Sequence, residues 1–82
     1  MPIEDLRTKI DEVDKKILAL IEKRVHLTQK IGQAKKKKGL PVYDPKREEE
    51  ILSRLTANTT ADKDFIRKTF THIIKYCREN EK

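Results

Sequence analysis

An apolar seam along the first half of the chain limits what this sequence can fold into. Spacings of three and four residues, sustained over more than about four heptads, are typical of a long helix packed against other helices. Gly39 and Pro41 predict the end of that helix, so we expect it over residues 3–38. The seam consists of Ile3, Leu6, Ile10, Val13, Ile17, Leu20, Leu27, Ile31 and Ala34.

The length of this helix is incompatible with a small globule made from a single chain. A helix over residues 3–38 is about 50 Å long, whereas a compact domain of 82 residues is about 30 Å across. The remaining helices can cover part of the seam, and a second copy of the chain is the obvious candidate to cover the rest. We therefore expect a homodimer.

Two shorter helices are expected in the second half of the chain. Asp44 followed by Pro45 is typical of an N-cap with proline at the first helical position, which predicts a helix over residues 45–55. Apolar residues at helical spacing predict a third helix over residues 62–79. The expected fold class is all-α, with one long and two shorter helices in a single domain over residues 1–82. The expected buried face of the second helix is Ile51, Leu52 and Leu55, and the apolar residues at helical spacing in the third are Phe65, Ile66, Phe70, Ile73, Ile74 and Cys77.

The composition narrows the classes of partner and compartment. The net charge of +6 suits an anionic partner, which at this stage includes nucleic acid, a membrane surface and a small carboxylate. Cys77 is the one cysteine, so no intrachain disulfide is possible, and the N-terminus lacks the layout of a signal peptide. No apolar run reaches the roughly 18 residues that a membrane span needs, and His26 and His72 lack metal-ligand spacing. We expect a cytoplasmic protein without a metal site.

Arg24 occupies the one seam position that should be apolar, between Leu20 and Leu27. A buried arginine without a partner is unfavourable, so something must compensate its charge. A buried ion pair, or a polar residue that fixes the register of a coiled coil, would be a sufficient explanation. Lys35 offers another, since it lies close to three turns further on, on nearly the same face and about 16 Å away. Two such cations suit a small anionic ligand, although Lys35 also begins a run of lysines, and charge runs are usually solvated.

A second group of charged residues lies at the start of the second helix. Asp44 has a structural role as an N-cap, whereas Arg47 and Glu48 lie one turn before the apolar face, so at least one of them is expected to point inward. A Glu48 that points into a basic pocket could accept a hydrogen bond from a ligand hydroxyl. Exposed arginines and glutamates are common, so exposure of both stays an alternative.

Arg7 and Glu81 lie near the two ends of the chain. Arg7 is about 25 Å from Arg24 along the first helix, too far to reach the same ligand within one chain, but an antiparallel helix of a second chain could bring it there. A solvated Arg7 is the simpler interpretation of the spacing alone. Glu81 continues the stripe of the third helix after Ile73 and Cys77, so it either lies over the pocket or belongs to a frayed tail.

Five short segments form a specific pattern in their order and spacing, although each is weak alone. They are residues 6–7 (LR), 10–14 (IDEVD), 20–24 (LIEKR), 31–35 (IGQAK) and 41–48 (PVYDPKRE). In this pattern the chain resembles the all-helical class of chorismate mutases over nearly its whole length. The resemblance implies an intertwined homodimer with two active sites, and the long first helix would contribute to both.

The resemblance also implies roles for individual residues. Arg24 and Lys35 of one chain and Arg7 of the other would line each pocket, and the two arginines would bind the two carboxylates of chorismate. Lys35 would bridge a carboxylate and the ether oxygen, while Glu48 and the backbone near Asp44 would hold the ring hydroxyl. The implied reaction converts chorismate to prephenate, in the biosynthesis of phenylalanine and tyrosine. This intramolecular Claisen rearrangement needs no nucleophile, metal or cofactor, only a compact conformer and stabilised negative charge on the ether oxygen.

Three further positions complete the implied site. Arg47 would complete the cationic wall of the pocket. Cys77 aligns with a position where the family often has a small hydroxyl residue, and Glu81 aligns with one where a glutamine often donates to the ether oxygen. A glutamate must be protonated to donate, so we expect activity that rises toward acidic pH.

Three other functions fit part of the sequence. An isochorismate-pyruvate lyase would have the same fold and a cationic pocket, but the acidic Glu48 favours the mutase. A basic helical module that binds nucleic acid would use the net charge and the lysines at 35–38. Against it, acids are interleaved along residues 3–38, which contain no aromatic residue for base stacking. A purely structural coiled-coil dimer leaves Arg24 without a role beyond register.

Overall fold

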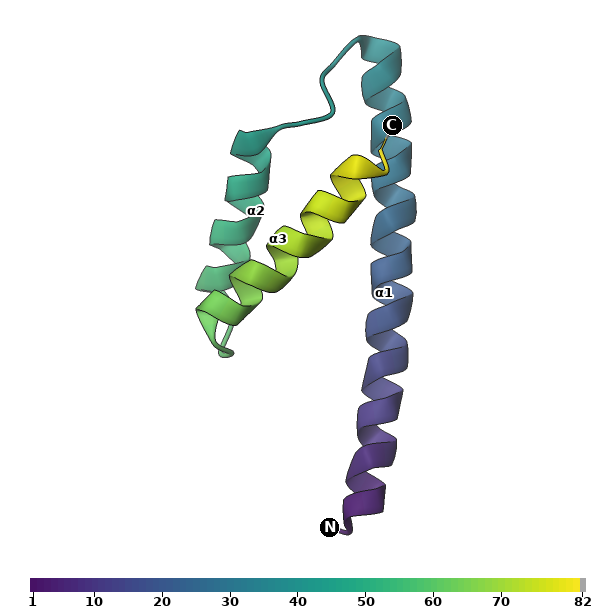
Figure 1. The fold of residues 1–82 in the computed structure, drawn as a ribbon, viewed down its shortest axis with the longest axis vertical. Helices are drawn as coiled ribbons and strands as arrows, with labels where there is room; N and C mark the ends of the chain where they lie inside the picture. The colour runs from purple at the N-terminus through teal and green to yellow at the C-terminus, as the bar shows by residue number, and fades with distance from the viewer. Residues whose placement is uncertain (82) are drawn as a thin grey trace.

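A computed structural model describes residues 1–81, which form three helices and no strand. The helices are α1 (Ile3–Lys38), α2 (Pro45–Ala57) and α3 (Lys63–Glu79). In Figure 1, α1 stands as a long rod, and α3 runs obliquely from the end of α2 to the upper part of α1. The predicted all-α class, with one long and two shorter helices, is confirmed. Lys82, the last residue of the predicted domain, lies outside the described residues.

The end of α1 is set by a single glycine. Gly39 has φ 68° and ψ 25°, a left-handed conformation that glycine adopts without the steric penalty of a side chain. Its N–H donates to the carbonyl of Lys36 at 3.2 Å, and the N–H of Leu40 donates to that of Lys35 at 2.8 Å. These two bonds form a Schellman motif, which satisfies carbonyls that would otherwise lack partners at the end of the helix.

The bounds of α2 and α3 differ slightly from the prediction. α2 continues to Ala57, two residues beyond the expected end, and the Thr56 hydroxyl donates to a carbonyl of the preceding turn at 2.9 Å. This bond lets a polar residue sit within the last turn of the helix. α3 begins at Lys63 rather than at residue 62, because Asp62 is its N-cap and accepts from the N–H of Phe65 at 3.1 Å.

The core of the single chain is small and lies around α3. Leu52 of α2 and Ile74 and Cys77 of α3 are its buried apolar residues within residues 1–81. α3 packs against α2 on one side and α1 on the other. This explains why two of the three buried apolar residues lie on α3. Phe65 lies in the first turn of α3 and is exposed in the single chain.

Most of the apolar seam of α1 is left uncovered by the rest of the described chain. The exposed fraction is 43% for Leu6, 58% for Ile10 and 65% for Leu20. The molecule extends over 55 × 24 × 16 Å, and the first half of α1 projects beyond the other helices (Figure 1). Full burial of one large aliphatic side chain contributes about 1.5–3 kcal/mol, so this seam represents a large unused driving force for association.

The end of the chain touches α1 at Gly32. Gly32 is buried, and a Cβ atom at this position would overlap the carbonyl oxygen of Glu81 and approach its carbonyl carbon to 2.9 Å. Only a residue without a side chain therefore allows Glu81 to lie directly on α1. The contact fixes the segment that follows α3 against the last third of α1.

Gly32→Ala tests whether this contact matters for stability. Helix propensity alone would make alanine more stable by about 1 kcal/mol. We expect instead a loss of about 1–3 kcal/mol in the free energy of unfolding, because the added methyl group overlaps Glu81. Urea denaturation measures the difference, with Gln33→Ala, an exposed neighbour on α1, as the control. A Gly32→Ala protein as stable as the wild type would contradict a close contact.

Candidate active site

A cavity of about 340 Å³ opens where α1, α2, α3 and the α1–α2 connection converge. Its volume lies at the lower end of the range that is usual for pockets that bind small molecules. The lining combines an apolar wall with converging charged groups, and it includes every predicted site residue except Arg7. The lining residues are Arg24, Leu27, Thr28, Ile31, Lys35, Val42, Asp44, Arg47, Glu48, Ile51, Ile74, Cys77, Arg78 and Glu81.

Arg24 projects from the middle of α1 into this cavity. Its Nη1 atom is enclosed, yet no group among residues 1–81 accepts a hydrogen bond from it. The neighbouring Thr28 hydroxyl is engaged by the backbone of α1, where it donates to the carbonyls of Arg24 and Val25 at 3.0 and 2.9 Å. An enclosed guanidinium nitrogen without an acceptor is unfavourable, so the cavity is suited to an anion that supplies one.

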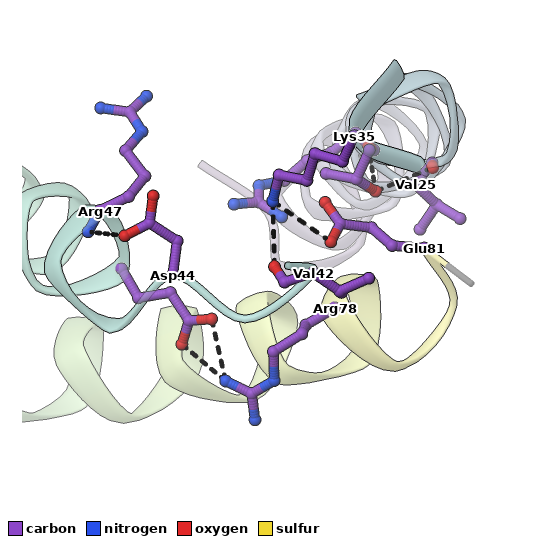
Figure 2. Close-up of polar contacts among 10 residues, drawn as sticks. Val25, Lys35, Val42, Asp44, Arg47, Arg78 and Glu81 are labelled. Carbon is purple, nitrogen blue, oxygen red and sulfur yellow. Dashed lines mark hydrogen bonds and ion pairs between the residues drawn. The ribbon is translucent and has the colours of Figure 1, made fainter. Parts of the chain in front are cut away.

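Lys35 crosses the cavity from α1 and meets two acceptors on other segments (Figure 2). Its Nζ donates to the carbonyl of Val42 at 3.0 Å and lies 3.6 Å from the Glu81 carboxylate. Lys36, by contrast, is exposed. Lys35 is therefore distinct from the solvated lysines that follow it, and the structure brings it into the same cavity as Arg24.

Glu81 lies over the cavity rather than in a loose tail. Its side chain is only 8% exposed, and its backbone N–H donates to the carbonyl of Arg78 at 3.3 Å. The contact with Gly32 holds the backbone of Glu81 against α1. Its carboxylate is thus fixed beside Lys35, with which it forms an ion pair.

Asp44 and Arg47 occupy the edge of the cavity at the start of α2. The Asp44 carboxylate accepts from the backbone N–H of Arg47 at 3.1 Å, as expected for an N-cap. The Arg47 guanidinium is exposed, lies 3.9 Å from Glu50, and points away from Lys35 and Glu81 in Figure 2. Arg47 therefore borders the cavity with a side chain that is free to turn toward it.

Glu48 is half-buried and is held by Arg78, a residue that was not among the predicted site residues. Nη1 of Arg78 donates to both carboxylate oxygens of Glu48, at 2.8 and 2.9 Å. The Arg78 guanidinium also lies over the ring of Tyr43, 4.5 Å from its centroid. The hydrogen bond with Glu48 raises the pKa of Arg78 above its ordinary value, so Arg78 is a permanent cation. Its position one turn after Ile74 was the available signal in the sequence.

Cys77 and Arg7 represent the two extremes of accessibility among the predicted residues. Cys77 is 2% exposed, carries a free thiol and lines the cavity from α3. Arg7 is exposed near the start of α1, and its recorded partner is Glu4, at 3.0 Å, on the preceding turn. The structure does not bring Arg7 to the cavity of its own chain, in agreement with the distance estimated from the sequence.

Two other classes of site are absent from the described part of the chain. Within residues 1–81, no group of at least three His, Cys, Asp or Glu side chains could hold a metal ion. No helix in the same range is both long enough and apolar enough to cross a membrane.

The fold and the cavity define a class of small helical protein with a cationic pocket for a compact anion. Comparison with known families then gives the family itself: residues 6–82 match the model of chorismate mutase type II. The match covers well over half of the sequence, and the chain belongs to this family. The resemblance inferred from the segment pattern is thereby confirmed.

Solved structures and curated proteins agree with this assignment. The structure of chorismate mutase (Form II) from Thermus thermophilus superimposes with a TM-score of 0.93 at 43% identity, covering 96% of this chain and 92% of that one. Chorismate mutase from Methanocaldococcus jannaschii is 42% identical over 65% of this chain and 54% of its own length. T-protein from Enterobacter agglomerans is 35% identical over 94% of this chain and 22% of its own length. The chain therefore spans well under two thirds of these curated relatives.

Proposed function

We propose that this chain is a chorismate mutase, which rearranges chorismate to prephenate in the biosynthesis of phenylalanine and tyrosine. The observation that carries the proposal is the enclosed Nη1 of Arg24, which lacks an acceptor among residues 1–81 and faces a cavity shared with Lys35. Chorismate is a compact dianion with a carboxylate for Arg24 to bind. Membership of the chorismate mutase type II family supports the same activity.

The rearrangement requires positioning of the substrate and electrostatic stabilisation rather than covalent catalysis. Chorismate must be held in a compact conformer, with its two reacting carbons close together. As the C–O bond breaks, negative charge grows on the ether oxygen, and a fixed cation in a pocket with apolar walls stabilises it. Lys35 is already directed across the cavity by the carbonyl of Val42, so its ammonium needs little reorganisation to serve a carboxylate and the ether oxygen.

The remaining residues of the cavity would define the orientation of the substrate. Glu48 would accept a hydrogen bond from the ring hydroxyl, beside the backbone near Asp44. Arg47, which is exposed and free to turn, would complete the cationic wall. The Cys77 side chain would pack against the ring, and its free, buried thiol suits a reducing compartment, so a cytoplasmic location is part of the proposal.

A second copy of the chain is part of the proposed enzyme. The exposed seam of α1 needs an apolar cover, and the family resemblance assigns the second carboxylate of chorismate to an arginine of the other chain. An intertwined homodimer meets both needs, because an antiparallel α1 from the other copy would cover the seam and carry Arg7 to the cavity. In one chain Arg7 has only an exposed ion pair with Glu4, an interaction that contributes little and is easily exchanged.

Among the predictions on activity, the first concerns the role of Arg24. We expect Arg24→Ala to lower kcat/KM for chorismate by about 100-fold or more, because the carboxylate loses its enclosed donor. Incubation with chorismate, followed by NMR of the products, measures the effect and identifies prephenate. The matched control is Arg67→Ala, which removes an exposed arginine that pairs with Glu49 on the outer surface.

The same assay separates the mutase from the lyase of the same fold. A folded wild-type protein that leaves chorismate unchanged, but cleaves isochorismate to release pyruvate, would replace the proposal with the lyase. Prephenate formation by Arg24→Ala at the wild-type rate would remove Arg24 from the site. Loss of activity in Arg67→Ala as well would indicate a general effect of lost positive charge.

The second prediction tests the origin of Arg7 by mixing two inactive variants. Arg7→Ala and Arg24→Ala should each be nearly inactive as homodimers. After joint unfolding and refolding, about half of the dimers contain one chain of each kind, and one site in each of these carries both arginines. About a quarter of the wild-type activity should therefore return. Native mass spectrometry verifies that mixed dimers form, and mixed dimers without activity would contradict a contribution from the second chain.

The third prediction concerns Glu81 and pH. An ionised Glu81 pairs with Lys35, whereas donation to the ether oxygen requires a proton on the Glu81 carboxyl. The protonated fraction of a carboxyl increases as pH falls, so kcat should rise toward acidic pH. Glu81→Gln donates at every pH and should flatten the profile. The control is Glu79→Gln, an exposed neighbour on α3, and a Glu81→Gln profile identical to that of the wild type would exclude Glu81 from the mechanism.

A further inference from the structure

Three segments meet at the Glu48 carboxylate on one side of the cavity. Glu48 comes from α2, Arg78 from α3, and Tyr43 from the connection between α1 and α2. Both oxygens of Glu48 accept from Nη1 of Arg78, and the guanidinium carbon lies 4.5 Å from the centroid of the Tyr43 ring. A guanidinium placed over an aromatic face is held by its stem and by cation–π attraction, so the donor itself is fixed in position.

A second arginine–glutamate pair joins the same two helices and provides a comparison. Arg67 of α3 donates to both oxygens of Glu49 of α2, at 2.9 and 2.6 Å. The side chains of that pair are 44% and 58% exposed, and neither residue lines the cavity. The side chains of Arg78 and Glu48 are 27% and 23% exposed, and both residues line it. Clamping α2 to α3 is thus a function that the outer pair can serve, whereas the inner pair lies at the cavity.

We infer that Arg78 is a positioning residue for Glu48 and thereby sets the selectivity of the cavity for a substrate with a ring hydroxyl. This inference rests on the proposed function, and it adds a residue that the family resemblance did not supply. Arg78 occupies one side of the carboxylate through a single nitrogen and leaves other lone pairs of Glu48 free to accept. A hydroxyl that donates to such a carboxylate makes a charge-assisted hydrogen bond of fixed direction.

The charges around the cavity explain why Glu48 needs a dedicated partner. Arg24, Lys35 and Arg47 also line the cavity, and each is an alternative partner for a carboxylate that is free to turn. A Glu48 paired with one of them would both lose its orientation toward the hydroxyl and neutralise a cation that the substrate dianion requires. Arg78 prevents this exchange because it satisfies Glu48 locally, at a position fixed by Tyr43.

The experiment compares two substrates in wild-type and variant enzymes. One substrate is chorismate, and the other is its analogue in which hydrogen replaces the ring hydroxyl, with both carboxylates and the ether retained. The measured quantity is the ratio of kcat/KM for the two substrates. In Arg78→Met, which keeps the apolar stem over Tyr43, this ratio should fall about tenfold or more, mainly through a higher KM for chorismate. The analogue, which makes no bond to Glu48, should be turned over nearly as before.

Three further variants make the result specific. Arg67→Met removes the outer pair and should leave the ratio unchanged. Glu48→Gln should lower the ratio by itself, and adding Arg78→Met to it should lower the ratio no further, since Arg78 acts through Glu48. Arg78→Lys retains a cation without the planar fork and should give an intermediate ratio. Circular dichroism monitors folding, and the lysine variant provides the same test if the methionine variant does not fold.

The outcomes separate this inference from the function on which it rests. A ratio that stays at the wild-type value in both Arg78 variants would overturn the positioning role of Arg78. Formation of prephenate by the wild type in the same experiment would still support the mutase function. An equal fall of the ratio in Arg67→Met would also overturn it, because the effect would then come from the packing of α2 on α3. A folded wild type without activity on chorismate would overturn both the function and the inference.

Discussion

The contact between the end of α3 and α1 at Gly32 is the constraint on which the cavity depends. α3 packs against both other helices, and it is the element through which α1 and α2 are held together beyond their covalent connection. The backbone of Glu81 reaches α1 because Gly32 has no side chain. This approach is accompanied by the position of Glu81 beside Lys35, and Cys77 and Arg78 of the preceding turn line the same cavity. A larger residue at 32 would open the angle between the helices and separate these groups.

The charged residues of the cavity are arranged so that most of them are paired before a ligand arrives. Lys35 is neutralised by Glu81, and Arg78 by Glu48, whereas the enclosed nitrogen of Arg24 is left without an acceptor among residues 1–81. Pairing keeps the side chains in defined positions and limits the energy of concentrating like charges in a small volume. The enclosed nitrogen of Arg24 concentrates the attraction for an anion at one point of the cavity, whose apolar wall includes Leu27 and Ile31.

Much of the fold could be predicted from the sequence because its strongest signals are local and periodic. The seam, Gly39 and Pro41 specify α1, and Asp44 with Pro45 specifies the start of α2. Periodicity identifies a face of a helix but not how far along that face a neighbour extends, so the exposure of Phe65 at the start of α3 could not be predicted.

The candidate site was predictable in part for a similar reason. Arg24 was predictable because it interrupts the apolar seam of α1. Lys35 was predictable because it shares one face of the same helix with Arg24. Arg78 gave no comparable signal, because its role arises from the crossing of α3 with α2, which brings it to a glutamate 30 positions earlier in the chain. A contact between helices distant in sequence is set by the packing angle, which no local pattern specifies.

In the proposed homodimer, the uncovered seam of α1 would also tie the stability of the chain to its concentration. A helix that buries its apolar face only against another molecule gains the free energy of that burial through association. The rest of the chain contributes a core of very few buried side chains. In the proposed dimer, each tenfold dilution then removes about 1.4 kcal/mol from the free energy that holds the two copies together and folded. In that dimer the extended shape of α1 would make folding a second-order process, and the level of expression would then influence how much of the protein carries an intact cavity.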